Sequence, residues 1–195
     1  MIYIPLFELP VLIIMILIRS IILGRHGIKV IVFGETNKTD FIIVPIVLFF
    51  FYGIVSSVFG LPFPKILIKY FAEIKILNIC AIVICTVSLI WFGITLKIFG
   101  KSFRVGIDEN TKDKLITNGT FSISRNPVYV AFVTFFIGIL LAYPNIITLI
   151  FLIILSITIH RQVLREEKFL KDHYGNEYYE YCNKVRRYIG VKHSA

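Results

Sequence analysis

The chain has 195 residues, of which 57% are hydrophobic and 17% are charged, and its mean hydropathy is +0.82. A soluble domain carries about 45–50% apolar and about 25% charged residues, so this composition excludes an ordinary soluble protein and predicts an integral membrane protein. The net charge of +9 comes from basic residues that flank hydrophobic runs. This placement fits contact with lipid head groups and argues against a nucleic-acid partner.

The hydrophobic runs predict an all-α, polytopic protein with about five transmembrane helices. The first run contains Glu8, has no basic stretch before it and has no small-residue cleavage site after it, which favours a retained helix over a signal peptide. The last two runs are separated only by Tyr143, Pro144 and Asn145, so they form a C-terminal helical hairpin. The five predicted segments are residues 2–23, 41–60, 76–99, 127–142 and 145–162, within a single membrane domain, 1–195.

Lysine and arginine are distributed unevenly between the two ends of these segments. The stretches 24–40, 97–127 and 161–195 hold 17 of them, whereas the stretches at the opposite end hold 3. Because basic loops stay in the cytoplasm, this bias predicts an outside N-terminus and a cytoplasmic C-terminus.

The stretch 100–127 is too long for a simple connection between neighbouring helices, and loops beyond about 12–15 residues tend to be functional or disordered. It ends in "KLITNGTFSISRNPVY". Spaced apolar residues in this stretch predict a segment that is ordered and docked on the helices; they are Leu115, Ile116, Phe121 and Ile123.

The motif Arg125-Asn126-Pro127-x-Tyr129 has two interpretations. As a helix start, it places proline in the first turn, asparagine at the N-cap and tyrosine at the membrane interface. That interpretation does not require Arg125, so the same residues are also consistent with one wall of a binding site.

A charged helix is expected to continue from the last membrane segment as far as Gly175. Its Glu166-Glu167 pair either lies on a solvated face, with Glu167 pairing to Lys171, or binds a cationic or hydroxylated ligand. His160 and Arg161 at the inner end either reach toward the interface or face a substrate path. The three cysteines have no metal-like spacing, so no metal site is predicted.

Taken together, these stretches resemble the isoprenylcysteine carboxyl methyltransferase family, which belongs to a wider group that includes the phospholipid N-methyltransferases. The resemblance covers roughly residues 76–190. It rests on an ordered set of motifs: L-[VI]-x-x-G-x-[YF], R-[HN]-P-x-Y, E-E and [FY]-G-x-E-Y-x-x-Y.

The resemblance implies a helical bundle with a cytoplasmic lid that binds S-adenosyl-L-methionine, with 1–75 as N-terminal transmembrane helices and 76–195 as the catalytic part. It implies cofactor contacts from Leu115, Ile116, Gly119, Phe121, Arg125, Asn126, Pro127, Tyr129, Glu166 and Glu167. Arg125 and Arg161 are candidate catalytic residues, and the candidate substrate contacts are Arg161, Gln162 and Arg165. The chain departs from the family pattern at Asn126, where a histidine is usual, and at Gln162, where an arginine is usual.

The leading prediction is therefore an integral membrane methyltransferase that acts on a lipid-like or prenylcysteine-type acceptor. One alternative is an NADPH-dependent reductase of the sterol-reductase kind, which shares parts of the motif set. The other is a non-enzymatic transporter or scaffold; the lack of charges in the centres of the predicted membrane segments argues against it.

Overall fold

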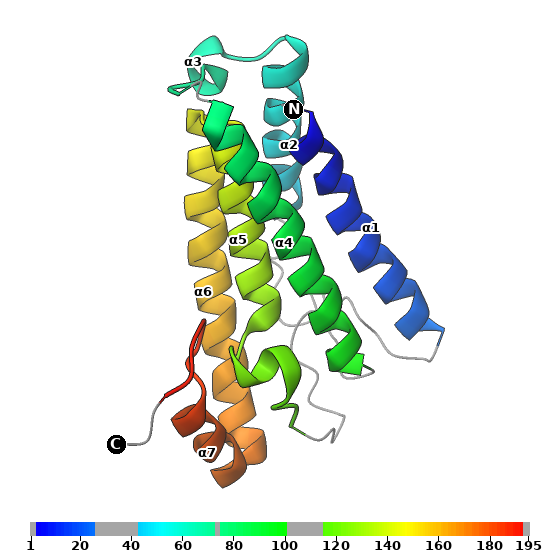
Figure 1. Ribbon diagram of the computed structural model, residues 1–195, viewed down its shortest axis with the longest axis vertical. Helices are drawn as coiled ribbons and strands as arrows, with labels where there is room; N and C mark the ends of the chain where they lie inside the picture. The colour runs from blue at the N-terminus through cyan, green and yellow to red at the C-terminus, as the bar shows by residue number, and fades with distance from the viewer. Residues whose placement is uncertain (1–2, 26–42, 73–74, 101–114, 193–195) are drawn as a thin grey trace.

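The computed structural model describes residues 3–25, 43–72, 75–100 and 115–192. Within these ranges, apolar helices occupy all five predicted membrane segments (Figure 1). They are α1 (Ile4–Gly24), α2 (Ile43–Phe59), α4 (Lys75–Phe99), α5 (Pro127–Ala142) and α6 (Ile146–Tyr174). The shorter elements are α3 (Lys65–Ile68), the 3-10 helix η3 (Gly119–Ser122) and α7 (Asn176–Lys184). The predicted loop residues 24–40 and 100–127 lie partly outside the described residues.

The lengths and surfaces of these helices are those of a membrane protein. Helices α1, α4 and α6 are long and apolar enough to cross a bilayer, and α2 and α5 are shorter apolar helices. Large apolar side chains stay exposed along the outer faces, such as Phe7 on α1 and Ile90 on α4. An exposed apolar surface of this extent is stable in contact with lipid but not with water. The predicted all-α membrane fold is therefore confirmed for the described part of the chain.

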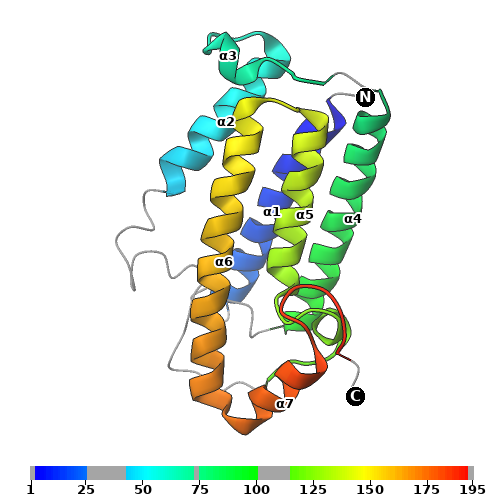
Figure 2. The same cartoon turned by 90° about the vertical axis from the view of Figure 1, so that its left-hand side faces the viewer.

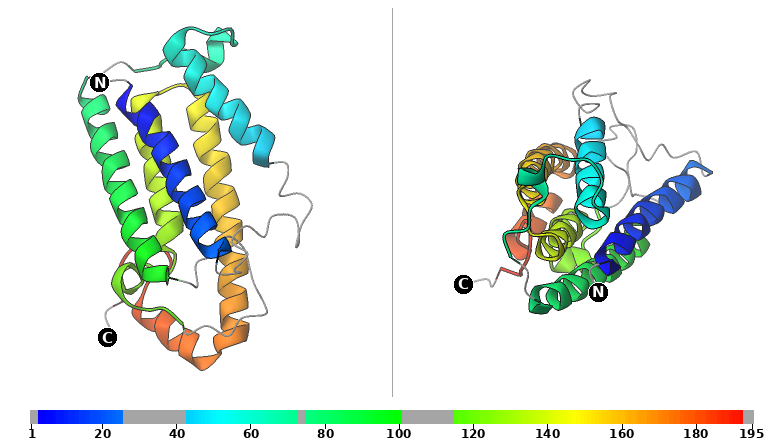
Figure 3. Two further views of the ribbon diagram at one scale, coloured as in Figure 1. Left: turned by 90° about the vertical axis from the view of Figure 1, so that its right-hand side faces the viewer. Right: turned by 90° about the horizontal axis from the view of Figure 1, so that it is seen from above.

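Helices α4, α5 and α6 form a row at the centre of the bundle (Figures 1 and 2). Helix α1 packs against α4 and α5, and α2 packs against α6 (Figure 3). Helix α3 lies at one end of the bundle, whereas η3 and α7 lie at the other (Figures 1 and 2). The C-terminal part of the long loop and the charged tail thus meet at one end, as their shared basic character predicts; which side of the membrane this end faces stays a prediction.

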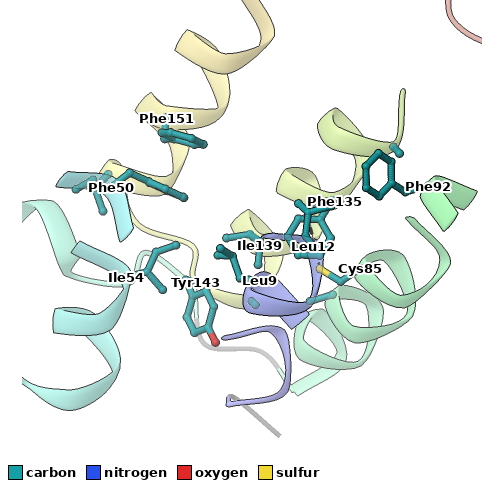
Figure 4. Packing of buried hydrophobic residues seen from close by; sticks show 14 of the residues in the cluster. Leu9, Leu12, Phe50, Ile54, Cys85, Phe92, Phe135, Ile139, Tyr143 and Phe151 are labelled. Carbon is teal, nitrogen blue, oxygen red and sulfur yellow. Dashed lines mark hydrogen bonds between the residues drawn. The ribbon is translucent and has the colours of Figure 1, made fainter. Parts of the chain in front are cut away.

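The apolar core lies between the helices of this row and the two helices that flank it (Figure 4). The rings of Phe50 and Phe151 stack with centroids 3.6 Å apart, which joins α2 to α6. Gly138 allows α4 and α5 to pack closely, because a Cβ atom at this position would lie 2.5 Å from the Cys85 Sγ and 3.2 Å from the Ala81 carbonyl oxygen. Close packing of this kind leaves little freedom for α5 to shift along α4.

A capped turn fixes the α5–α6 hairpin. The backbone N–H of Thr148 donates to the Asn145 side chain at 3.0 Å, and the Thr148 hydroxyl donates to the Tyr143 carbonyl at 2.6 Å. The first bond satisfies a free N–H at the start of α6, and the second satisfies a carbonyl at the end of α5; the turn confirms the predicted break between the two helices. Because the hairpin is antiparallel, the first turn of α5 and the last turns of α6 lie at the same end of the bundle.

Helix α6 continues without a break through the charged segment, as predicted, and ends before Gly175, whose φ is +52°. After α7, residues 185–192 form a hook that turns back on itself. Within the hook, the Arg186 N–H donates to the Gly190 carbonyl at 2.8 Å. The hook also binds the segment before α5, since the Gly190 N–H donates to Ile123 at 2.9 Å and the Arg125 N–H donates to Arg186 at 3.1 Å. The hook is therefore hydrogen-bonded to the segment that leads into α5.

Candidate functional site

The first turn of α5 is held in place from two sides. Pro127 is the first helical residue, as predicted, and its carbonyl accepts a hydrogen bond of 3.0 Å from the indole N–H of Trp91 on α4. Asn126 stands at the N-cap position, but its side chain does not cap the helix. Its amide nitrogen donates instead to the Glu167 carboxylate and to the Arg187 carbonyl, both at 3.1 Å. The helix-start interpretation is thus correct for Pro127 and wrong for the Asn126 side chain.

Glu167 is the centre of a group that we call the Glu167 cluster: Glu167, Arg125, Asn126 and Arg187. The Glu167 Oε1 atom faces the Arg125 Nη2 atom at 3.0 Å and receives the Asn126 amide at 3.1 Å. Its Oε2 atom faces the Nε and Nη2 atoms of Arg187, each at 3.0 Å. Four donors fill the lone-pair positions of one carboxylate. Glu167 therefore has no acceptor capacity left for a ligand.

Burial makes these contacts strong. Glu167 is 3% exposed and Arg125 is 10% exposed, so both charges have left bulk water and depend on each other for compensation. The hydrogen bond to Glu167 raises the pKa of the Arg187 guanidinium above its usual value. The solvated-face interpretation, in which Glu167 pairs with Lys171, is wrong: this carboxylate points into the protein.

Glu166 belongs to a separate group, the Glu166 cluster: Glu166, Tyr129, Gln162 and Arg165. Its Oε1 atom accepts hydrogen bonds from the Tyr129 hydroxyl at 2.6 Å and from the Gln162 amide at 2.8 Å. Arg165 donates to the Gln162 carbonyl oxygen at 2.6 Å. Among the described residues, none donates a hydrogen bond to the Glu166 Oε2 atom. The two neighbouring carboxylates thus differ: Glu167 is saturated, whereas Glu166 keeps one oxygen as an acceptor.

Tyr181 of α7 supports the segment that carries Arg125, and Tyr178 is buried beside it on the same helix. The Tyr181 hydroxyl donates to the Phe121 carbonyl at 2.6 Å, and the Ser124 hydroxyl accepts the Asn126 N–H at 3.0 Å. Burial raises the pKa of the Tyr178 phenol well above its usual range, and the charge of Glu167 adds to this shift. Tyr178 is 1% exposed and therefore stays protonated at physiological pH.

The structure brings five of the predicted cofactor-site residues together in these two clusters: Arg125, Asn126, Tyr129, Glu166 and Glu167. Of the predicted substrate contacts, Gln162 and Arg165 join the Glu166 cluster, whereas Arg161 is exposed on α6 outside both clusters.

The other predicted site residues lie beside the clusters or in the packing around them. The Phe121 ring packs edge-on against Phe99 at the end of α4, with centroids 5.0 Å apart. Leu115 packs on the tyrosines of α7, and Ile116 next to it is half-buried. Gly119 begins η3 with a φ of +59°, which is a conformation that favours glycine. These residues shape the support of the site, and their contact with a cofactor stays a prediction.

Sequence reasoning missed Arg187, Tyr178 and Tyr181. In the sequence, Arg187 is one of the basic residues of the stretch 161–195 that predict orientation, and Tyr178 and Tyr181 belong to the last motif of the family resemblance. The spacing of Tyr178 and Tyr181 in the last motif was the available signal, because residues three apart share one face of a helix. For Arg187 there was none, since its contact with Glu167 depends on the path of the hook.

Comparison with known proteins identifies the family. The family model described as phospholipid methyltransferase matches residues 74–177, which are 104 of the 195 residues. The chain belongs to the phospholipid methyltransferase family. The match runs from the start of α4 to the start of α7, so it includes both carboxylates and Arg125 but ends before the hook.

Curated relatives support the same family. Two proteins named "Probable protein-S-isoprenylcysteine O-methyltransferase", from Oryza sativa subsp. indica and subsp. japonica, are each 33% identical to the chain over 90 residues. The aligned part is 44% of this chain and 47% of each relative, so the chain spans about half the length of these relatives. No solved structure matches this phospholipid methyltransferase family member. Its described residues contain no group of histidine, cysteine and acidic side chains that could hold a metal ion.

Proposed function

We propose that this chain is an integral membrane methyltransferase that uses S-adenosyl-L-methionine and acts on a lipid-like or prenylcysteine-type acceptor. The observation that carries the proposal is the difference between its two adjacent carboxylates. Glu167 is saturated by four donors, whereas the Glu166 Oε2 atom, beside Tyr129 where α5 meets α6, has no donor among the described residues. Membership of the phospholipid methyltransferase family supports the methyl-transfer chemistry.

The residues present fit this cofactor. Its ammonium group and ribose hydroxyls are hydrogen-bond donors that the Glu166 Oε2 atom would accept, and the Tyr129 ring would offer an aromatic face to a cation. The buried Arg125 Nε atom, which has no hydrogen-bond partner among the described residues, is a donor for a carboxylate. When bound, the cofactor supplies an activated methyl group on a sulfonium sulfur.

The protein's task in such a transfer is orientation rather than nucleophilic attack. Glu166, Tyr129 and Gln162 are hydrogen-bonded to one another and would hold the methyl donor in one place, and the first turn of α5, held by Trp91, would limit the access of water. Arg161 and Arg165 are exposed on α6 near this site and would attract an acidic group of the acceptor, such as a carboxylate or a phosphate. In this proposal, residues 76–195 carry the chemistry, with the polar loop and the C-terminus on the cytoplasmic side and the N-terminus outside, while 1–75 supply N-terminal membrane helices.

The proposal is tested by calorimetric titration of the detergent-purified protein with S-adenosylhomocysteine and, separately, with NADPH. We expect binding of the first ligand and none of the second, which would separate a methyltransferase from a reductase and from a scaffold. The Glu166→Gln variant should bind S-adenosylhomocysteine at least about tenfold more weakly, since a hydrogen bond to a charged group contributes about 1.5–3 kcal/mol. Glu180→Gln is the matched control, because Glu180 is exposed on α7.

Binding of NADPH alone would overturn the proposal, and an unchanged affinity for S-adenosylhomocysteine in Glu166→Gln would remove this carboxylate from the site. The acceptor class is tested by methyl transfer from labelled S-adenosylmethionine to a prenylated cysteine and to phosphatidylethanolamine vesicles. Methylation of neither acceptor would refute the assignment to lipid-like acceptors.

A further inference from the structure

The hook, residues 185–192, is attached to the site by its backbone as well as by side chains. The Arg125 N–H donates to the Arg186 carbonyl, and the Gly190 N–H donates to the Ile123 carbonyl. An isolated bridge between Val185 and Val191 closes the hook itself. These bonds hold the hook against the segment that precedes α5, although the hook lies outside the part of the chain that matches the family model.

Two neighbouring hook side chains contact α6 at two positions along its length. Arg187 binds Glu167 through two nitrogen atoms at 3.0 Å, and Tyr188 shares a hydrogen bond of 2.6 Å with the His160 ring. His160 and Glu167 are seven residues apart, which is about two turns and about 10.5 Å along one face of a helix. The backbone of Arg187 also contacts the start of α5, because its carbonyl accepts the amide of the N-cap residue Asn126 at 3.1 Å.

We propose that Arg187 is a positioning residue for Glu166: by holding Glu167 against the start of α5, it fixes the rotation of α6 and so directs Glu166 toward Tyr129. This inference rests on the proposed function, in which Glu166 is the carboxylate that contacts the cofactor. It assigns a part of the site to the hook, which neither the motif set nor the family match includes.

The geometry of the helix gives the reason. Adjacent residues of an α-helix point about 100° apart, since 3.6 residues make one turn. Whatever holds the Glu167 side chain toward Arg125 and Arg187 therefore also sets the direction of Glu166. Without Arg187, Glu167 keeps Arg125 and Asn126 on one oxygen but loses both donors to the other. The carboxylate can then turn about its side-chain torsions, and this end of α6 keeps only the bond between His160 and Tyr188 as a side-chain hydrogen bond to the hook among the described residues.

The test compares Arg187→Met with Arg186→Met. The second variant removes the same charge from the neighbouring residue, whose side chain is exposed. Calorimetry with S-adenosylhomocysteine should give at least about tenfold weaker binding for Arg187→Met and less than about twofold for Arg186→Met. Arg187→Lys should bind better than Arg187→Met, because it keeps the charge and one donor. Equal affinities in Arg187→Met and Arg186→Met would overturn the proposal.

A double-mutant cycle separates positioning from general support of the fold. If Arg187 acts through Glu166, then Arg187→Met should change the affinity by less than about twofold in the Glu166→Gln background. A merely structural role predicts that the two losses multiply, and that result would overturn the proposal.

Hydrogen exchange without any ligand keeps this test independent of the cofactor assignment. In the full-length protein, peptides covering residues 160–170 should exchange faster in Arg187→Met than in Arg186→Met. Equal exchange in the two variants would refute the positioning role even if the wild type binds S-adenosylhomocysteine. If the wild type binds no S-adenosylhomocysteine, the proposed function fails, and the exchange result alone decides whether Arg187 holds α6.

Discussion

Replacing Glu167 by glutamine removes the only carboxylate of the Glu167 cluster and leaves its two guanidinium groups. Glutamine keeps the shape, but its amide nitrogen becomes a donor that faces other donors. Arg125 is 10% exposed and stays charged, so it becomes a buried cation without compensation. Breaking a buried pair in this way costs about 3–5 kcal/mol. Arg187 is 36% exposed and regains hydration, so most of the cost arises at Arg125.

The assay is thermal unfolding in detergent, followed by the fluorescence of Trp91. In a chain of this size, each kcal/mol shifts the melting temperature by about 2–4 °C, so Glu167→Gln should melt roughly 6–20 °C below the wild type. The control is Glu180→Gln, the same chemical change at an exposed position of α7, which should stay within about 2 °C of the wild type. Equal melting of the two variants would refute the argument that the buried Arg125 charge depends on Glu167.

Two further changes test other contacts by the same unfolding assay. Asn126→Asp keeps the shape of the side chain but replaces the amide donor with an oxygen that faces the Glu167 Oε1 atom and the Arg187 carbonyl. This variant should therefore lose about 1–3 kcal/mol of stability. Asn118→Asp at an exposed position is its control, and similar melting of both would show that the Asn126 amide is not a donor. Gly138→Ala should lower the free energy of unfolding by about 1–3 kcal/mol, because the added Cβ atom forces α4 and α5 apart. Its control is Gly24→Ala, whose Cβ atom meets no other atom within 4 Å and which should leave the stability unchanged. An unchanged stability in Gly138→Ala would contradict the close packing of α4 and α5.

Much of the helix framework followed from the sequence because an apolar run of membrane length has few other stable structures. The predicted segment 127–142 coincides with α5, and 76–99 differs from α4 by one residue. Proline and asparagine between the last two apolar runs predict a turn, and the structure has this turn, where Asn145 caps the start of α6.

The partners of the two glutamates did not follow from the sequence. Once α6 leaves its apolar part, charged residues occur on every face, and periodicity no longer tells which face is buried. Glu167 therefore looked like a partner of Lys171, four residues away, although its partners lie 42 positions before it and 20 after it. Which basic residue reaches it is decided by the path of the hook, and that path depends on backbone hydrogen bonds to residues before α5.

The length of α5 links the site to the thickness of the bilayer. Its 16 residues span about 24 Å, whereas the hydrocarbon layer is about 30 Å thick. This mismatch of about 6 Å is met by local thinning of the membrane or by sinking the first turn of α5 below the head groups. Tyr129 lies in that turn, so either response brings the Glu166 cluster closer to the depth at which a lipid tail joins its polar group. A thin membrane therefore suits this site better than a thick one.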